Sequence, residues 1–398
     1  MFASLNALAP DPILGLIAKA RKDTNPQKVD LGVGVYKDES GATPIMSAVK
    51  CAEQKCIDVE QSKAYIGPAG PEAFGAGIKE LMFGRQHTAL KDDRVRTVLT
   101  PGGCGALRVG AEFLKRCSEN ATIWVSDPTW ANHIPLLGNA GLKLAEYPYY
   151  EAGSKHIKFD EMMSALVNAG QGDIVLLHGC CHNPCGADLS EAQWRDITAL
   201  AAKNGFLPFI DLAYQGFGRG LDEDAYGVRH MSEQLPELIV ASSCSKNFGL
   251  YRERVGALSL LGGNAAQANA GITHINNVVR GNYSMPPSHG GAIVGEILGD
   301  QALRQEWETE LTLMRKRING LRVLLADKLA AQGVDRDFSF IAKQRGMFSF
   351  LGLSSAQVDQ LREDFSIYMV SSSRVNIAGI SQSNIDYLVA SLAAVIAK

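Results

Sequence analysis

The sequence predicts an α/β protein with a mainly parallel central sheet, helices on both faces of that sheet, and a smaller α+β domain. Through the middle of the chain, short apolar runs rich in β-branched residues alternate with longer helical patterns. From about residue 301 the pattern changes to long amphipathic helices. Strand–helix alternation is typical of parallel strands joined by crossover helices, which then cover both faces of the sheet.

Six apolar segments predict the strands of this sheet, because each is too short for a helix and is bounded by turn residues. They are Arg96–Thr100, Thr122–Ser126, Ile174–His178, Leu207–Asp211, Leu238–Ser242 and Ala257–Leu261. Between them lie helical patterns such as Leu107–Cys117 and Glu191–Ala202.

The C-terminal part predicts a second, smaller unit. A long amphipathic helix over Gln305–Leu329 precedes a short mixed region, Phe338–Leu351, and two further helices. We therefore expect an N-terminal arm with part of the small domain (residues 1–44), a large domain (45–300), and an interdomain helix with the small C-terminal domain (301–398).

Composition and charge narrow the class of protein. Of 398 residues, 46% are hydrophobic and 20% charged, and the net charge is −3, so no basic stripe is available for nucleic acid. No apolar run reaches the roughly 18 residues of a membrane span. The N-terminus has no positive segment and carries Pro10 and Pro12. The eight cysteines, with Cys180 and Cys181 adjacent, fit free buried thiols of a cytoplasmic protein.

Polar residues stand directly after several predicted strands. Ligands of open parallel sheets bind at the carboxyl ends of the strands. The residues at this edge are Asn183, Asp211, Tyr214, Ser243, Ser245 and Lys246. Taken singly, Asp211 could cap a helix, Asn183 could belong to a turn, and Lys246 could be a solvated side chain. Their common location favours a ligand site.

A glycine-rich turn, TPGGCGAL (Thr100–Leu107), follows one strand and begins a helix. That layout directs backbone N–H groups at an anion, although its spacing fits neither the dinucleotide fingerprint nor the P-loop. A bound phosphate would need a cation, for which Arg254 is the candidate. The alternative is a tight strand–helix turn.

Arg280 and Arg374 lie far apart in sequence, each among small and polar residues. An arginine fork binds a carboxylate through two parallel hydrogen bonds, so two such side chains would suit a dicarboxylic ligand. Two structural ion pairs are an equally good explanation.

The run HGCCHNPC (His178–Cys185) holds five possible metal ligands. Structural zinc sites draw their ligands from two separated clusters, and the sequence has no second one. Residues 178–181 also resemble the end of a buried strand, so we expect no metal site.

The segment SSCSKNFGLYRERVG (Ser242–Gly256) resembles the pyridoxal-lysine segment of the class I aminotransferases, in their aspartate and aromatic branch. Further matching segments follow the family's order between residues 12 and 380. They are LGVGVYKDESGATP, SDPTWANH, HGCCHNPCGADLS, DLAYQGFGRG, RGNYSMPPSHG and RGMFSFLGLS. The resemblance implies the aspartate aminotransferase-like fold of pyridoxal-phosphate-dependent transferases, with the cofactor in the large domain and a homodimer that shares its active sites.

By this resemblance, Lys246 holds pyridoxal 5'-phosphate covalently and, once released, acts as the general base. Asp211 pairs with the pyridine nitrogen, and Asn183 and Tyr214 bond to the ring's phenolic oxygen. Trp130 stacks on the ring. Trp130 and Asn183 also face the substrate.

The resemblance also implies the remaining contacts of the cofactor and substrate. The phosphate is held by Gly103, Cys104, Ser243, Ser245 and Arg254, with Tyr65 from a partner subunit. Arg374 binds the α-carboxylate, and Arg280 of the partner binds the distal carboxylate. Gly34 contacts the substrate through its backbone, on a loop that closes over the site.

The implied reaction moves the amino group of L-aspartate to 2-oxoglutarate, giving oxaloacetate and L-glutamate. It is a ping-pong reaction in which pyridoxal and pyridoxamine phosphate alternate. The substrates are thus amino acids and 2-oxo acids.

Some residues depart from the family pattern. Cys104 replaces a small hydroxyl residue, and Cys185 replaces a common threonine. A thiol is the weaker hydrogen-bond donor. Met285 stands where aspartate-selective members usually carry asparagine, and with Ala64 it favours room for aromatic side chains. Val35, Lys37 and Thr43 instead fit the aspartate-selective pattern. We expect aspartate as the substrate, with an aromatic amino acid aminotransferase as the alternative.

A different class of protein also uses this fold, as a non-catalytic ligand sensor in transcription regulators. Such proteins need a fused DNA-binding module, and no basic helix-turn-helix pattern precedes residue 12. The presence of Lys246 and of both arginines further favours an enzyme.

Overall fold

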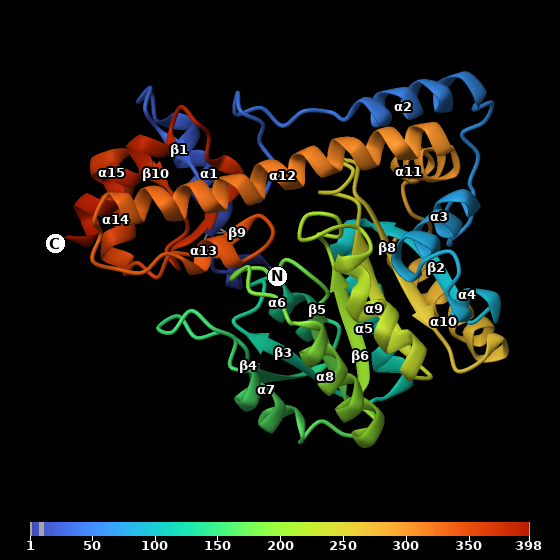
Figure 1. The fold of residues 1–398 in the computed structure, drawn as a ribbon. Coiled ribbons are helices and arrows are strands. Elements are labelled where there is room, and N and C mark those ends of the chain that lie inside the picture. Colours follow the sequence, from blue (N-terminus) through green and yellow to red (C-terminus); the bar gives the residue numbers. More distant parts are fainter. Residues whose placement is uncertain (1, 8–11, 398) are drawn as a thin grey trace. The chain divides into compact units, whose positions relative to one another are not determined.

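The structure is a computed structural model that describes residues 2–7 and 12–397. It divides into two compact units. The small unit comprises the described residues up to Ala42 with Ile318–Lys343 and residues 347–397, and the large unit comprises Thr43–Arg317 with Gln344–Gly346. Helix α12 (Gln301–Ala331), drawn in orange in Figure 1, supplies residues to both units.

The large unit is built on a seven-stranded sheet of order β2-β8-β7-β6-β5-β3-β4. Its strands are β2 (Val95–Pro101), β3 (Thr122–Asp127), β4 (Lys143–Pro148), β5 (Ile174–His178), β6 (Leu207–Leu212), β7 (Leu238–Ser243) and β8 (Val255–Leu261). All neighbouring pairs are parallel except those of β8, which is antiparallel to both β2 and β7. The carboxyl ends of β2, β3, β5, β6 and β7 therefore share one edge with the start of β8.

The central strands are buried on both faces. In β5, Leu176 belongs to the core cluster formed with α5 (Gly102–Cys117) and α10 (Ala265–Asn282). Its neighbours Val175 and Leu177, whose side chains point to the opposite face, are also fully buried. Burial on both faces explains why these strands read as unbroken apolar runs rather than as alternating patterns.

The other helices of the large unit cover this sheet and each other, with α3 contacting α9 and α11, and α9 contacting α8. They are α2 (Ser47–Val59), α3 (Glu72–Phe83), α4 (Thr88–Lys91), α6 (His133–Gly138), α7 (Phe159–Leu166), α8 (Glu191–Asn204), η2 (Glu223–Ala225), α9 (Tyr226–Gln234) and α11 (His289–Gly299). Local signals set their ends. Helix α8 begins with a capping box of Ser190 and Gln193 and ends at Gly205 in the left-handed region.

The small unit contains two two-stranded sheets. Strand β1 (Val29–Asp30) pairs in parallel with β10 (Ile367–Tyr368), and β9 (Phe348–Phe350) pairs antiparallel with β11 (Arg374–Asn376). The remaining elements are η1 (Phe2–Ser4), α1 (Pro12–Lys22), α13 (Phe340–Lys343), α14 (Ser355–Phe365), η3 (Ile377–Gly379) and α15 (Ile385–Ile396). The fully buried Arg322 of α12 connects α13 and β9, because its guanidinium donates to the carbonyls of Ile341 and Phe348.

The fold class predicted from the sequence is confirmed, as are all six predicted strands, whose observed ends differ by at most two residues. Strand β4 is a seventh that the sequence analysis missed. The expectation that residues 178–181 continue a buried strand is wrong, because β5 ends at His178. Within the described part of the chain, no helix combines the length and apolar character needed to cross a membrane.

Gly256 of β8 lies where the strand passes the start of α5. A Cβ atom added there would come within 2.7 Å of the Gly103 nitrogen and would also overlap the Gly102 carbonyl. We predict that Gly256→Ala lowers the free energy of unfolding by about 2–3 kcal/mol, because a rigid backbone must move. Denaturant unfolding measures this value. The control is Gly320→Ala, in an open position of α12. A loss no larger than the control's contradicts the prediction.

Candidate active site

The predicted site residues of the large unit gather at the shared carboxyl edge of the sheet. Each lies in the last residues of a strand or after it. Gly103 and Cys104 follow β2, Trp130 follows β3, Asn183 follows β5, Asp211 and Tyr214 are at the end of β6, and Ser243, Ser245 and Lys246 are at the end of β7. Arg254 immediately precedes β8. The topology therefore brings together residues that are up to about 150 positions apart.

The Lys246 amine lies in the middle of this group. Its Nζ atom is 4.7 Å from the centre of the Tyr214 ring. Removal from water lowers the pKa of Lys246 below 10.5, with the Arg254 charge acting in the same direction, while Asp211 and Cys104 act against it. A lysine with a lowered pKa has a larger neutral fraction, which is the form that accepts a proton or attacks a carbonyl.

Trp307 of α12 fixes the segment that carries Lys246. Its buried indole N–H donates to the Asn247 carbonyl over 2.7 Å, and its ring stacks on Phe248 at 4.4 Å between centroids. The two residues after Lys246 are thus held from one side. This role could not be predicted from local sequence, because Trp307 looks like an ordinary apolar residue of an amphipathic helix.

The Asp211 carboxylate is buried and bonded to a chain of polar side chains. His133 Nε2 is 3.0 Å from Asp211 Oδ2, and Thr129 Oγ1 lies 2.8 Å from His133 Nδ1 and 3.1 Å from His178 Nε2. Burial raises the pKa of Asp211, but the His133 hydrogen bond and the charges of His133, His178 and Lys246 outweigh it, so the pKa is lowered. The carboxylate stays ionised. His133 lies in the segment SDPTWANH, where no local pattern predicts a role for it.

The proton positions in this chain follow from the donors available. Burial, with the His133 charge, lowers the pKa of His178 to about 3, so its ring is neutral. An ionised carboxylate can only accept, so His133 Nε2–H donates to Asp211. In the His133 tautomer that carries its proton on Nε2, Thr129 donates its one proton to His133 Nδ1 and accepts from His178 Nε2–H. The chain therefore ends in hydrogen-bond donation to the carboxylate.

A second branch contains Cys185, one of the departures from the family pattern. Ser126 Oγ donates to the Pro128 carbonyl (2.9 Å) and therefore accepts from His182 Nε2 (3.1 Å). Burial lowers the pKa of His182 well below 6.5, so its Nδ1 atom is an acceptor. The Cys185 sulfur lies 3.2 Å from this atom, and the thiol donates to it. A threonine hydroxyl could make the same bond.

The start of α5 forms an anion cup, the name used here for Gly102, Gly103, Cys104, Ser243, Ser245 and Arg254. Gly102 has φ +70° and its N–H donates to the Arg254 carbonyl (2.9 Å). A Cβ atom at Gly102 would lie 2.9 Å from Arg254 Cζ, and one at Gly103 would lie 3.2 Å from Ser243 Cβ. Side chains at these positions would fill the cup. Two serine hydroxyls, a guanidinium and a helix N-terminus suit a phosphate monoester.

Trp130 and Asn132 border the cup on the β3 side. The half-buried Trp130 packs edge-to-face on His133, with ring centroids 5.3 Å apart. Asn132 Nδ2 lies 3.7 Å from the Cys104 sulfur, beside a cavity of about 560 Å³ that Tyr283 also lines. The wall next to Cys104 is therefore mixed in polarity.

Asn183 lies in a loop whose backbone is hydrogen-bonded by Asp188. The Asp188 carboxylate accepts from the backbone N–H groups of Cys181 and His182, both at 2.8 Å. Asn183 itself is buried and precedes a cis peptide bond to Pro184. The loop thus presents Asn183 at the same edge as Asp211.

In the small unit, Gly34 and Arg374 meet at one aromatic ring. The buried Arg374 has its guanidinium carbon 4.2 Å from the centre of the Phe348 ring and donates to the Gly32 carbonyl (3.1 Å). A Cβ atom at Gly34 would come within 2.7 Å of Phe348 Cζ. Both residues are therefore placed by Phe348, through the pairing of β9 with β11.

Tyr65 and Arg280 lie on the surface of the chain. Tyr65 is 94% exposed, in the segment between α2 and α3. Arg280 is exposed in the last turn of α10 and donates to the Ser284 hydroxyl. Neither side chain is buried in the site of its own chain.

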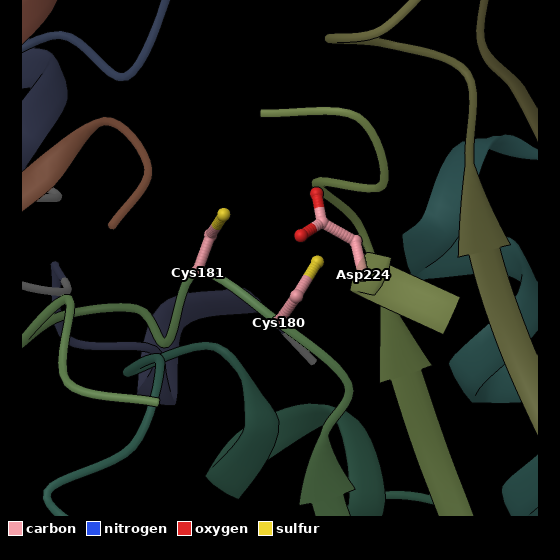
Figure 2. Close-up of side chains that lie close together, drawn as sticks. All are labelled: Cys180, Cys181 and Asp224. Carbon is pink, nitrogen blue, oxygen red and sulfur yellow. The ribbon is translucent and has the colours of Figure 1, made fainter. Parts of the chain in front are cut away.

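Figure 2 shows the adjacent Cys180 and Cys181 next to Asp224, with ligand atoms within 4.8 Å of one another. The Asp224 carboxylate already accepts backbone N–H groups of Gly216 (2.9 Å), Gly218 (2.8 Å) and Arg219 (2.8 Å). Its evident role is to hold the loop that follows Tyr214.

The cysteines are all free thiols, but the expectation that they are buried is wrong for Cys51 and Cys117. Both lie on outward faces of helices, α2 and α5. A small thiol fits such a face as well as a buried one.

Comparison with known proteins agrees with this geometry. The family model for aminotransferase class I and II matches residues 26–392. Aspartate aminotransferase of Haemophilus influenzae is 48% identical over 396 residues, covering 100% of both chains. Aromatic-amino-acid aminotransferase of Pseudomonas aeruginosa is 45% identical, covering 100% of this chain and 99% of that one.

Among solved structures, the aromatic-amino-acid aminotransferase of Burkholderia pseudomallei, covalently bound to pyridoxal phosphate, superposes with a TM-score of 0.97. The two chains are 43% identical, and the match covers 100% of this chain and 99% of the other. Sequence, fold and the grouping of residues around Lys246 agree, and the chain belongs to the class I and II aminotransferases.

Proposed function

We propose that this chain is a pyridoxal-phosphate-dependent aspartate aminotransferase, which transfers the amino group of L-aspartate to 2-oxoglutarate and releases oxaloacetate and L-glutamate. The observation that carries the proposal is the position of the Lys246 amine, over Tyr214 and within the electrostatic reach of Asp211 and Arg254. Relatives covering the whole chain bear the same activity in their names.

The large unit is the proposed cofactor domain, and its residues fit pyridoxal phosphate. The anion cup would hold the phosphate, and Lys246 would bond to the aldehyde carbon. Asp211, Trp130, Asn183 and Tyr214 would surround the ring. Bound pyridoxal phosphate supplies an electron sink for the electrons of the substrate Cα–H bond.

Lys246 is the proposed general base. When its amine is free, Nζ would take the proton from the substrate Cα and deliver it to the cofactor carbon that keeps the amino group. The lowered pKa serves this role, because a protonated amine has no lone pair for the transfer. The negative charge of Asp211 raises the pKa of Lys246 and so offsets part of the lowering caused by burial.

Asp211 has a second proposed role, at the pyridine nitrogen. An ionised carboxylate favours the protonated nitrogen, which makes the ring a better electron acceptor. The hydrogen bond from His133 keeps Asp211 ionised despite its burial. His133, Thr129 and His178 are thus positioning residues for the carboxylate.

The substrate carboxylates are assigned to two arginines. Arg374 would bind the α-carboxylate, with Gly34 contributing a backbone contact. Arg280 would bind the distal carboxylate of a substrate in a neighbouring subunit, and Tyr65 would reach that subunit's phosphate. A homodimer is supported by the exposed apolar residues Ile57 (66%), Val59 (71%) and Tyr65 (94%), because such surfaces mark protein contacts. We place the protein in the cytoplasm, as the free cysteines favour.

An aromatic amino acid aminotransferase is the second candidate. Met285, near the end of the segment that carries Arg280, and Ala64 next to Tyr65 both favour an apolar side-chain pocket. Val35, Lys37 and Thr43 favour aspartate, and Lys37 is held by Asp30 at 3.3 Å. We therefore assign aspartate as the main substrate and aromatic amino acids as secondary ones.

The pH dependence of Lys246 reactivity tests its lowered pKa. In cofactor-free protein, trace acetylation followed by mass spectrometry should label Lys246 half-maximally at a lower pH than the exposed Lys203, because burial disfavours the charged amine. Asp211→Asn should move this midpoint further down, since it removes the charge that raises the pKa. A Lys246 midpoint at or above that of Lys203 contradicts the assignment.

Replacement of the base tests the mechanism. Lys246→Ala should still bind pyridoxal phosphate, seen by its absorbance after gel filtration, because the cup is unchanged. Its kcat should fall by at least about 10²–10⁴-fold, the usual contribution of a general base. Lys203→Ala is the surface control. Retained turnover would contradict the assignment of Lys246 as the base.

Substrate preference separates the two candidate functions. With 2-oxoglutarate, kcat/KM should be higher for aspartate than for tyrosine or phenylalanine. Arg280→Ala should reduce kcat/KM for aspartate by about 10- to 150-fold, equivalent to a charge-assisted bond of ~1.5–3 kcal/mol, and change that for phenylalanine much less. Arg116→Ala, on an exposed face of α5, is the control.

Two results would change the conclusion. A preference of the unmodified enzyme for tyrosine would make the protein an aromatic aminotransferase. Equal losses for aspartate and phenylalanine in Arg280→Ala would make this arginine structural.

A further inference from the structure

The large unit contains a second cavity, of about 790 Å³, that shares no residue with the site around Lys246. It lies between the loop that follows Tyr214, the C-terminal end of α3, helix α9 and the first turns of α12. Five arginines from these elements line it: Arg85, Arg219, Arg229, Arg304 and Arg315. We propose that this cavity binds a small organic polyanion that carries phosphate or carboxylate groups. Its volume falls within the roughly 300–1,000 Å³ of small-molecule sites.

Three of the arginines are neutralised within the cavity wall. These ion pairs are Arg85–Glu80 (3.1 Å), Arg229–Asp222 (2.6 Å) and Arg304–Glu308 (3.0 Å). They orient the guanidinium groups but leave little net charge. The capacity for an anion therefore depends on the other two arginines.

Arg315 is the centre of the proposed site. It is partly buried, and its guanidinium donates to the Gly216 carbonyl (3.0 Å) and the Thr312 hydroxyl (3.3 Å). Both acceptors are uncharged, and Arg315 takes part in none of the ion pairs found among the described residues. Since five N–H donors are available on arginine, more than half remain for a ligand. A partly buried cation without a counter-ion attracts an anion strongly.

Arg219, which also lines the cavity, supplies a second available guanidinium. Its contact with Glu191 is long, at 3.7 Å, and both side chains are about half exposed (50% and 48%). Such a surface pair contributes at most about 1 kcal/mol, so a ligand can displace it. Arg315 and Arg219 could each bind one anionic group of the same molecule.

The spacing along α12 supports one continuous binding face. Arg304, Glu308, Thr312 and Arg315 follow one another at intervals of four or three residues, so they form a row on one side of the helix. Leu81, Leu221 and Leu298 also line the cavity and would contact the organic part of the ligand.

One carboxylate opposes an anion in this cavity. Glu223 lines it, is exposed, and forms no ion pair with the described residues. Its negative charge should weaken polyanion binding. Removing the Glu223 charge should therefore raise the affinity, whereas removing the Arg315 charge should lower it. Opposite effects of two neutralised residues in one cavity indicate that the anion binds in that cavity.

Isothermal titration calorimetry of the pyridoxal-phosphate-loaded enzyme, at constant ionic strength, tests the proposal with inorganic pyrophosphate and with citrate as probes. We expect saturable binding of at least one probe, at one site per chain. Arg315→Gln and Arg219→Gln should each weaken it by about 10-fold or more, the worth of a charge-assisted hydrogen bond. Glu223→Gln should tighten it. Arg116→Gln, outside the cavity, should leave it unchanged.

Two controls keep the result specific. Binding must persist in Arg374→Ala, because a probe in the proposed substrate site would lose affinity there. Far-UV circular dichroism and Tm must show that each variant is folded. If Arg315→Gln does not fold, the Arg219→Gln and Glu223→Gln variants still test the proposal.

Binding of pyrophosphate alone identifies a phosphate compound, binding of citrate alone identifies a polycarboxylate, and either supports the site. No saturable heat with both probes, or full affinity in folded Arg315→Gln and Arg219→Gln, overturns it. None of these outcomes depends on the aminotransferase assignment, which rests on Lys246.

Discussion

The site depends on keeping a negative charge at a place where water is excluded. Asp211 ends a strand in the middle of the sheet, and burial there favours the neutral acid. The structure counters this with donation from His133, whose ring is in turn held by Thr129 and His178. The charge that results acts on Lys246 and raises its pKa against the effect of desolvation. The two ionisable groups therefore adjust each other, and both depend on His133 at the start of α6 and His178 at the end of β5.

Much of this could be predicted from local sequence. The strands β5 and β6 are apolar on both faces and are bounded by turn residues, so their positions and the residues that follow them were evident. Strand β4, one of the two edge strands, was missed because Lys143 and Leu144 are exposed and no apolar run forms. The two-residue strands β1 and β10 are too short to show any period.

The positioning residues could not be predicted, for a different physical reason. Trp307 and His133 act through partners that lie 60 and 78 positions away in sequence, so their roles exist only in the folded chain. Arg315 is similar, because its partner is a backbone carbonyl and any residue could supply one. Lys246 and Asp211 lie in sequence motifs that can be recognised, whereas no local pattern predicts the roles of the residues that support them.

The antiparallel position of β8 has a consequence for biosynthesis. Strand β2 stands at the end of the sheet and neighbours β8 alone, with Val95 opposite Leu261 and Pro101 opposite Val255. During translation, β2 leaves the ribosome long before its partner strand is made. Until then its buried residues Val98 and Leu99 have no strand beside them. Because Gly256 of β8 packs against Gly102 and Gly103, the anion cup takes shape in the nascent chain only when Arg254 and Gly256 have also emerged.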